Sequence, residues 1–208
     1  PGEAERAIRV GQAVFGEIEK LPVPTVCAIH GTCLGGGVEL ALACRHRVAS
    51  DSPRTRIAFP EVLLGILPAW GGTTRLPRLI GLQASLDLLL TGKEADARKA
   101  RRIGLVSELF PASLFRDKVA EYALRTLGLP AEAPRPKRKL LTRMLDDTMP
   151  GRRIVLALAR RRVRTQTGGH YPAPLRILDI LGEHLGGQSD DSLDAEAHAA
   201  STLLVGIV

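Results

Sequence analysis

The chain has 208 residues and a formal net charge of +7, and it is 45% hydrophobic but only 3% aromatic, so its core is expected to be mainly aliphatic. No run of eighteen or more apolar residues occurs, which argues against a membrane span. The scarcity of aromatic residues and of nucleic-acid-binding motifs argues against a nucleic-acid partner, so we interpret the arginine-rich residues 152–164 as a solvated helix face or an interface.

The first half of the chain alternates helix-like and strand-like segments. Apolar spacing predicts a helix over residues 4–20, and short β-branched or apolar runs predict strands. These strands are expected at residues 25–29, 45–49 and 56–59, with a helix opened by the glycines at 35–37 between the first two. Further helices are expected around residues 86–90, 95–103 and 114–127, with a strand or extended segment at 106–110. This alternation predicts an α/β domain.

Residues 130–138 are rich in proline and basic side chains, which is typical of a linker. After it, helices are expected at residues 140–145, 154–163, 175–185 and 193–204. The sequence therefore predicts two parts, an α/β unit over residues 1–129 and an all-helical extension over residues 130–208.

Three glycines, Gly35 to Gly37, follow a hydrophobic strand and precede Glu39 at the start of an apolar helix. Backbone amides without a neighbouring Cβ can approach a ligand closely, and a helix N-terminus adds positive potential. A second acid, Glu61, stands among apolar residues and is followed by Gly71-Gly72. Apolar surroundings and a second carboxyl group nearby are both expected to raise a carboxyl pKa. Such a site can stabilise an enolate while it moves protons at carbon.

Together these segments resemble the enoyl-CoA hydratase/isomerase (crotonase) family. The resemblance implies a crotonase-like spiral of ββα units, here without its N-terminal strands. In that family the amide matching Gly36 donates to the thioester oxygen of an acyl-CoA, the acid matching Glu39 helps to activate a water, and the acid matching Glu61 supplies a proton to the α-carbon. Because both acids are present, hydratase chemistry is favoured, with Δ3-Δ2-enoyl-CoA isomerisation left open as a side activity.

Residues 65–72 resemble the family's loop after the second acid, although relatives often have glycine where Ala69 stands. We expect Gly35, Gly65, Pro68 and Trp70 to line the pocket. For Trp70 two interpretations remain, a cap on the core, which we favour, and a border of the acyl pocket. His30 stands beside a glycine at the end of a strand, and we interpret it as a turn histidine rather than a general base.

Residues 165–174 carry a Gly-Gly pair and Tyr-Pro-Ala-Pro, and they resemble the helical linker of multifunctional fatty-acid oxidation proteins (alpha subunits). There a hydratase/isomerase domain precedes a dehydrogenase. The resemblance implies an acyl-CoA substrate, an oligomer or a complex with a thiolase subunit, and no cofactor for hydration. NAD would serve only the dehydrogenase, whose Gly-x-Gly-x-x-Gly fingerprint this sequence lacks.

The resemblance also implies that strands supplying a second oxyanion amide precede this segment. We therefore expect a sequence truncated at both ends and weak or no activity from these residues alone. The alternative is an incomplete segment that serves only assembly. A bacterial source would imply the cytoplasm, while an organellar targeting segment stays open.

The three cysteines, Cys27, Cys33 and Cys44, match neither a CxxC motif nor a zinc pattern. We interpret them as small buried hydrophobic residues and expect no metal site.

Overall fold

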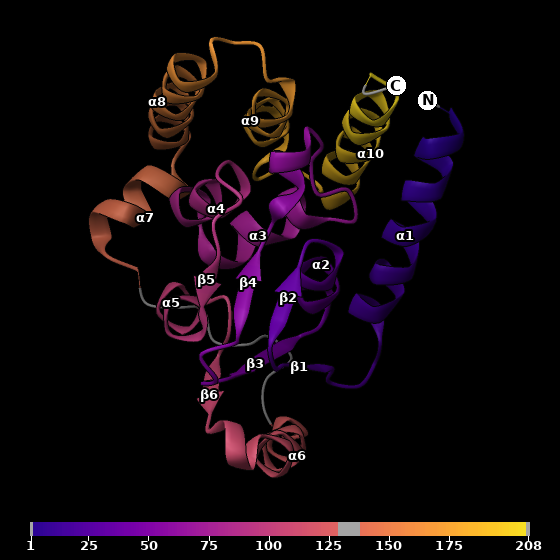
Figure 1. Ribbon diagram of the computed structural model, residues 1–208, viewed down its shortest axis with the longest axis vertical. Coiled ribbons are helices and arrows are strands. Elements are labelled where there is room, and N and C mark those ends of the chain that lie inside the picture. The colour runs from indigo at the N-terminus through magenta and orange to yellow at the C-terminus, as the bar shows by residue number, and fades with distance from the viewer. Residues whose placement is uncertain (1, 129–137, 207–208) are drawn as a thin grey trace.

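The computed structural model describes residues 2–128 and 138–206. Two small sheets lie at the centre, with helices above, below and to the left and right of them in the view of Figure 1. The elements up to the second acid are α1 (Gly2–Lys20), β1 (Val26–Ile29), β2 (Thr32–Leu34), α2 (Gly36–Ala43), β3 (His46–Ser50), β4 (Arg56–Ala58) and the short 3-10 helix η1 (Pro60–Leu64). They form a repeated strand-and-helix path that carries both acids.

The remaining elements are mostly helical. From Gly72 to Thr126 the chain forms α3 (Gly72–Ile80), α4 (Leu82–Leu89), β5 (Ala95–Asp96), α5 (Ala97–Ile103), β6 (Glu108–Phe110), η2 (Ala112–Leu114) and α6 (Phe115–Thr126). The extension forms α7 (Leu140–Asp147), α8 (Met149–Thr167), α9 (Pro172–His184) and α10 (Ser189–Gly206). Among the described helices, none is long and apolar enough to cross a membrane.

Each sheet has three described strands. One has the order β1-β3-β6 with parallel pairing throughout, in which Val26 lies opposite His46. The other has the order β2-β4-β5, in which β2 and β4 are parallel and β4 and β5 antiparallel. Parallel pairing requires a crossover between the strands, and α2 provides it between β1 and β3.

The structure confirms the predicted helices and strands, with shifts of a few residues at their ends, and the α/β alternation up to residue 128. Sequence analysis missed β2, because only three residues separate Gly31 from Gly35 and the run is too short to show a period. Residues 95 and 96, expected to begin a helix, pair with β4 instead, and Asp96 then caps α5. The predicted linker at 130–138 lies almost wholly outside the described residues.

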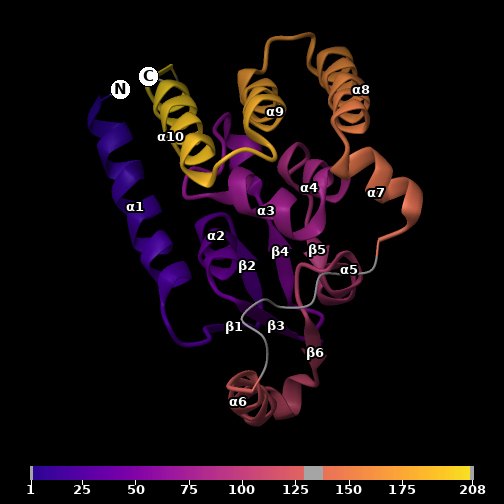
Figure 2. The ribbon, with the colours of Figure 1, turned by 180° about the vertical axis from the view of Figure 1, so that it is seen from behind.

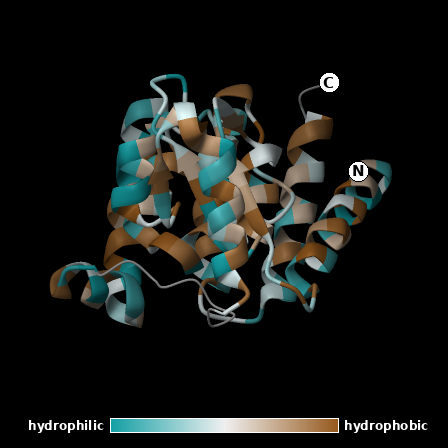
Figure 3. Cartoon of the chain, turned by 90° about the horizontal axis from the view of Figure 1, so that it is seen from below, coloured by the Kyte–Doolittle hydropathy of each residue, from teal (hydrophilic) through white to brown (hydrophobic). Residues whose placement is uncertain are grey.

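A single hydrophobic cluster joins the two predicted parts of the chain. It contains Phe59 and Leu76 from the α/β unit together with Ile177, Leu178 and Ala200 from the extension. Figure 2 shows α9 and α10 lying over α3, and in Figure 3 the strands and the inward faces of the helices are largely hydrophobic. The extension thus packs onto the unit that carries the acids.

The prediction that all three cysteines are buried is wrong, because Cys27, Cys33 and Cys44 are each partly exposed. Cys27 lies on β1 and Cys33 on β2, which are the edge strands of the two described sheets, and Cys44 follows the last residue of α2. An edge strand has no neighbouring strand on one side, which leaves Cys27 and Cys33 partly open to solvent.

Candidate active site

The first glycine of the triplet forms a turn that other residues adopt poorly. Gly35 has φ +51° and ψ −122°, a conformation available almost only to glycine. Its amide donates to the carbonyl oxygen of Ala58 at 2.9 Å, which fixes the turn to β4. Helix α2 begins at the next residue, so the Gly36 amide belongs to the first turn, where helical amides have no partner within the helix.

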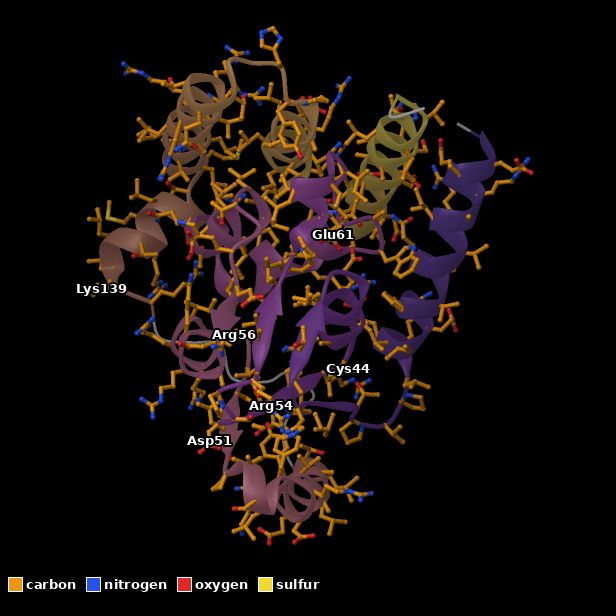
Figure 4. All side chains as sticks on the ribbon, in the orientation of Figure 1. Cys44, Asp51, Arg54, Arg56, Glu61 and Lys139 are labelled. Carbon is orange, nitrogen blue, oxygen red and sulfur yellow. The ribbon has the colours of Figure 1, made fainter. Side chains whose placement is uncertain are left out.

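Glu61 lies against this turn. It stands in η1, which starts with Pro60 and is capped at its C-terminal end by Gly65 in the left-handed conformation (φ +79°). A Cβ on residue 35 would collide with the Glu61 carboxyl oxygen Oε1, so the absence of a side chain at Gly35 makes room for the acid. In Figure 4 the labels of Glu61 and Cys44 mark the two ends of α2, with Glu61 near its N-terminus.

Glu39 lies one turn into α2 and is only 2% exposed. Its Oε1 accepts hydrogen bonds from the amides of Trp70 at 2.7 Å and Gly72 at 2.8 Å. The backbone can come this close because residue 72 is glycine, since a Cβ there would lie 3.0 Å from Glu39 Oε1 and 2.7 Å from Pro68 Cβ. Both hydrogen bonds use one oxygen of the carboxyl group, which leaves Oε2 available to carry a proton.

The surroundings of both acids favour their neutral forms. Burial raises the pKa of Glu39 to about 8, and the nearby charges of Glu196 and Glu61 act in the same direction, against the amides of Gly72 and Trp70. Burial likewise raises the pKa of Glu61. Glu61 Oε2 is buried without a hydrogen-bond partner among the described residues. Such an acid is prepared to donate or exchange a proton with something that enters the site.

The other residues expected to line the pocket lie around these groups. Trp70 is 39% exposed, and its ring covers Gly36, with Cζ3 2.7 Å from where a Cβ would stand. The same ring contacts Gly11 of α1 and lies edge-on to Phe15, with 5.6 Å between centroids. The structure therefore brings Gly35, Gly36, Glu39, Glu61 and Trp70 together, while Gly65 ends η1 and Pro68 contacts Gly72.

Comparison with known proteins identifies the family. The family model described as Enoyl-CoA hydratase/isomerase matches residues 5–164. The chain belongs to the enoyl-CoA hydratase/isomerase family. The match includes the glycine turn, both acids and α3, and it continues into α8.

Curated relatives of the chain include the fatty acid oxidation complex subunit alpha of Shewanella amazonensis, 46% identical over 94% of this chain and 27% of the relative. The corresponding subunit of Shewanella putrefaciens is 42% identical over 98% of this chain and 28% of the relative. The chain thus spans a little over a quarter of the length of these relatives.

Solved structures agree on the fold. An enoyl-CoA hydratase from Bacillus anthracis matches 99% of this chain and 63% of its own, with 25% identity and a TM-score of 0.58. DspI from Pseudomonas aeruginosa matches 63% of this chain and 53% of its own, with 30% identity and the same TM-score. The expected crotonase-like α/β fold, followed by helices, is confirmed.

Sequence analysis missed a third acid in this enoyl-CoA hydratase/isomerase family member. Glu196 of α10 is 0% exposed and reaches the segment that holds Glu39, with bonds to Gly71, Thr73 and Thr74. A signal was present, since Glu196 falls on the same helix face as the buried residues Ala200 and Leu203. An acid on an apolar face needs partners inside the protein.

His30 contacts a different part of the molecule from the two acids. It is exposed, and its ring faces Phe115 of α6 with 5.5 Å between centroids. Among the described residues, no group of three or more His, Cys, Asp or Glu side chains is arranged to hold a metal ion.

Substituting Gly35 with alanine is expected to displace Glu61. The backbone strain of a positive φ alone costs about 1–2 kcal/mol. The matched control is Gly31→Ala, because Gly31 has φ +81° and nothing lies within 4 Å of its Cβ position. Denaturant unfolding should show a lower free energy of unfolding in both variants, with the larger decrease in Gly35→Ala. Equal decreases would mean that Glu61 can move aside without a cost in free energy.

The contribution of Glu39 to the free energy of unfolding is expected to fall as pH rises. Its pKa is about 8 in the folded chain and 4.5 in the reference state, so folding takes up a proton between these values. The stabilising contribution is complete below about pH 4.5 and is lost as pH rises through about 8. Glu39→Gln, which mimics the neutral acid, should therefore gain thermal stability relative to the unsubstituted chain from pH 5 to 8. The control is Glu17→Gln, which replaces an exposed acid. If the difference in thermal stability between Glu39→Gln and the unsubstituted chain did not change with pH, the prediction would be contradicted.

Proposed function

We propose that the chain carries an enoyl-CoA hydratase site, which converts a 2-trans-enoyl-CoA to a 3-hydroxyacyl-CoA. The observation that carries the proposal is the buried Glu39 carboxyl, held by two amides, with Glu61 close enough to influence its pKa. Glu39 lies in the first turn of α2, and Glu61 of η1 lies against Gly35, next to the Gly36 amide, which has no partner within the helix. Family membership and the relatives' printed names support the same reaction class.

The proposed reaction begins with the thioester. Its carbonyl oxygen accepts a hydrogen bond from the Gly36 amide, which stabilises the negative charge that develops there as the β-carbon is attacked. A preorganised donor of this kind lowers the barrier by roughly 3–4 kcal/mol. The positive potential of the α2 N-terminus acts in the same direction.

The two acids divide the proton transfers. The oxygen of the water bonds to the β-carbon while ionised Glu39 takes one proton from this water. Neutral Glu61 gives its proton to the α-carbon. One acid gains a proton and the other loses one, so a proton exchange restores both. A raised pKa suits Glu61 as the acid. Because the pKa of Glu39 is about 8, its ionised form, which acts as the base, is populated mainly near and above that pH.

Isomerisation of a Δ3-enoyl-CoA to the Δ2 form is a second activity within the same proposal. It requires one acid to remove a proton from one carbon and return it to another, and Glu61 supplies such a group. The enolate is stabilised as in hydration. No metal or redox cofactor enters either reaction, and CoA takes part as the carrier of the substrate.

The wider setting of the site is also part of the proposal. The relatives are named as alpha subunits of a fatty acid oxidation complex in bacteria. We place this chain in such a complex in the cytoplasm, with a thiolase subunit as partner and with NAD serving a dehydrogenase domain. Residues 1–129 would form the hydratase unit and 130–208 the helical extension.

The test is hydration of crotonyl-CoA by the purified chain, followed as loss of ultraviolet absorbance by the conjugated thioester. We expect weak turnover that exceeds the uncatalysed rate and disappears when both acids are replaced by glutamine. A turnover equal to that of the double variant would reject the proposal for this chain.

A second candidate function is assembly without catalysis. The observation in its favour is a set of exposed apolar side chains on α7 and α8, namely Leu140, Leu141, Met144, Met149, Ile154 and Leu158. Exposed apolar surface of this kind is typical of interfaces. Sedimentation of the chain, compared with thioester binding, separates the two functions: self-association without binding favours assembly.

A further inference from the structure

Glu196 brings a third carboxyl group to the segment that precedes α3. The acid lies on α10, more than 120 residues from its partners. It accepts hydrogen bonds from the amides of Gly71 and Thr73, the latter at 3.1 Å, and from the hydroxyl groups of Thr73 and Thr74. A fully buried carboxyl group with this many donors holds the backbone that provides them.

Two acids share this segment in alternation. The amides of Trp70 and Gly72 donate to Glu39, whereas those of Gly71 and Thr73 donate to Glu196. Gly71 permits the arrangement because it caps α3 in the left-handed conformation, with φ +106°. Four consecutive amides therefore point alternately to a carboxyl group on α2 and to one on α10.

We propose that Glu196 is a positioning residue for Glu39, which it holds in place and influences electrostatically through residues 70–73. The proposal rests on the proposed hydratase function, in which Glu39 activates the water. It gives the helical extension a part in the chemistry of a site whose other residues all lie between Gly35 and Thr74. A purely structural residue would support the backbone without changing how Glu39 titrates.

The charged groups around Glu196 determine how removing its charge should affect Glu39. The charged groups near it are Glu39 of α2 and Arg75 of α3, and Arg75 also bonds to Glu19 of α1. α1 contributes the neutral Gln12, which donates to the carbonyl oxygens of Ala69 and Leu193. The buried residues of α9 are apolar. Among these groups, Glu196 is the largest like-charge influence on Glu39.

Neutralising Glu196 should therefore make Glu39 a stronger acid. In Glu196→Gln the repulsion is gone, and we expect the pKa of Glu39 to fall. Glu196→Asp keeps the charge but withdraws it by one methylene group. This variant should lower the pKa of Glu39 by less than Glu196→Gln does, and it lengthens the bonds to Gly71 and Thr73.

The experiment is a titration of the chain with 13C-labelled glutamate carboxyl groups, observed by NMR, with the Glu39 signal assigned from Glu39→Gln. The control Asp191→Asn removes a negative charge from an exposed position on the same helix and should leave Glu39 unchanged. The expected result is a Glu39 midpoint that is lowered most in Glu196→Gln and is unchanged in Asp191→Asn. Equal midpoints in Glu196→Gln and the unsubstituted chain would overturn the proposal.

Glu196→Asp provides a second measurement in case Glu196→Gln does not fold. It retains an acid for the donors of Gly71 and Thr73, and it moves the charge back toward α10. The Glu39 midpoint should therefore fall in Glu196→Asp, by less than in Glu196→Gln. An unchanged Glu39 midpoint in a folded Glu196→Asp chain overturns the proposal.

Hydration assays, together with the titration, test the role of Glu196 and the hydratase function separately. Where the chain hydrates crotonyl-CoA, Glu196→Gln should lower kcat more than it changes KM, and should shift the acidic limb of the pH profile to lower pH. A chain without hydratase activity that still shows the Glu39 shift contradicts the hydratase function and leaves the coupling of the acids intact. An active chain without the shift contradicts only the role of Glu196.

Discussion

Glu39→Gln and Glu61→Gln should each lower the rate of enoyl-CoA hydration by about 10²–10⁴-fold, the usual contribution of a positioned acid or base. Glutamine retains the shape of the acid and, at residue 39, an oxygen for the amides of Trp70 and Gly72. The fold should therefore persist while proton transfer is lost. The measurement is kcat and KM for crotonyl-CoA hydration, with folding checked by circular dichroism.

The control for these substitutions is Glu121→Gln, which neutralises an exposed acid that pairs with Lys118 on α6. It should leave both kinetic constants unchanged. Because the two acids act in one step, replacing both should reduce the rate by less than the product of the single effects. Full activity in either single variant would remove that acid from the proposed mechanism.

The second large effect is expected in the core that joins the extension to the α/β unit. Ile177 of α9 is 0% exposed and belongs to the same cluster as Phe59 and Leu76. Ile177→Ala should lower the free energy of unfolding by roughly 2–5 kcal/mol, because it removes buried methyl groups and leaves a cavity. Because the core is shared, unfolding should remain a single transition, measured by circular dichroism in urea.

Leu158→Ala is the matched control, since Leu158 is 62% exposed on α8. Its effect should stay within about 0.5 kcal/mol, as for most surface substitutions. Two separate transitions, of which Ile177→Ala shifts only one, would mean that the extension unfolds independently. The boundary proposed after residue 129 would then separate two folding units as well as two segments of sequence.

Local sequence patterns predicted the glycine turn and the two acids of α2 and η1. A triple glycine between a strand and a helix specifies its own geometry, as Gly35 illustrates with its positive φ. An acid among apolar neighbours, such as Glu61, indicates burial before any partner is known. These predictions depend on few residues at short range, and local conformation is sufficient to decide the geometry of the turn.

The role of α10 could not be predicted in this way. Glu196 meets Thr73 across 123 residues, and their contact depends on how α10 packs against α3. The helix itself was expected, but its apolar face does not specify which surface it covers. The exposure of the cysteines follows the same rule, because sheet order decides which strands are edges, and the sequence of Cys27 or Cys33 does not contain that order.

Trp70 connects the acid and the glycine amide through two different parts of one residue. Its backbone donates to Glu39, while its ring lies over Gly36. A smaller side chain at this position would enlarge the space above Gly36 and still present the same amide to Glu39. Under the proposed hydratase function, the space above Gly36 and the hydrogen bond to Glu39 can therefore be changed separately at residue 70, whose ring also packs against Gly11 and Phe15 of α1.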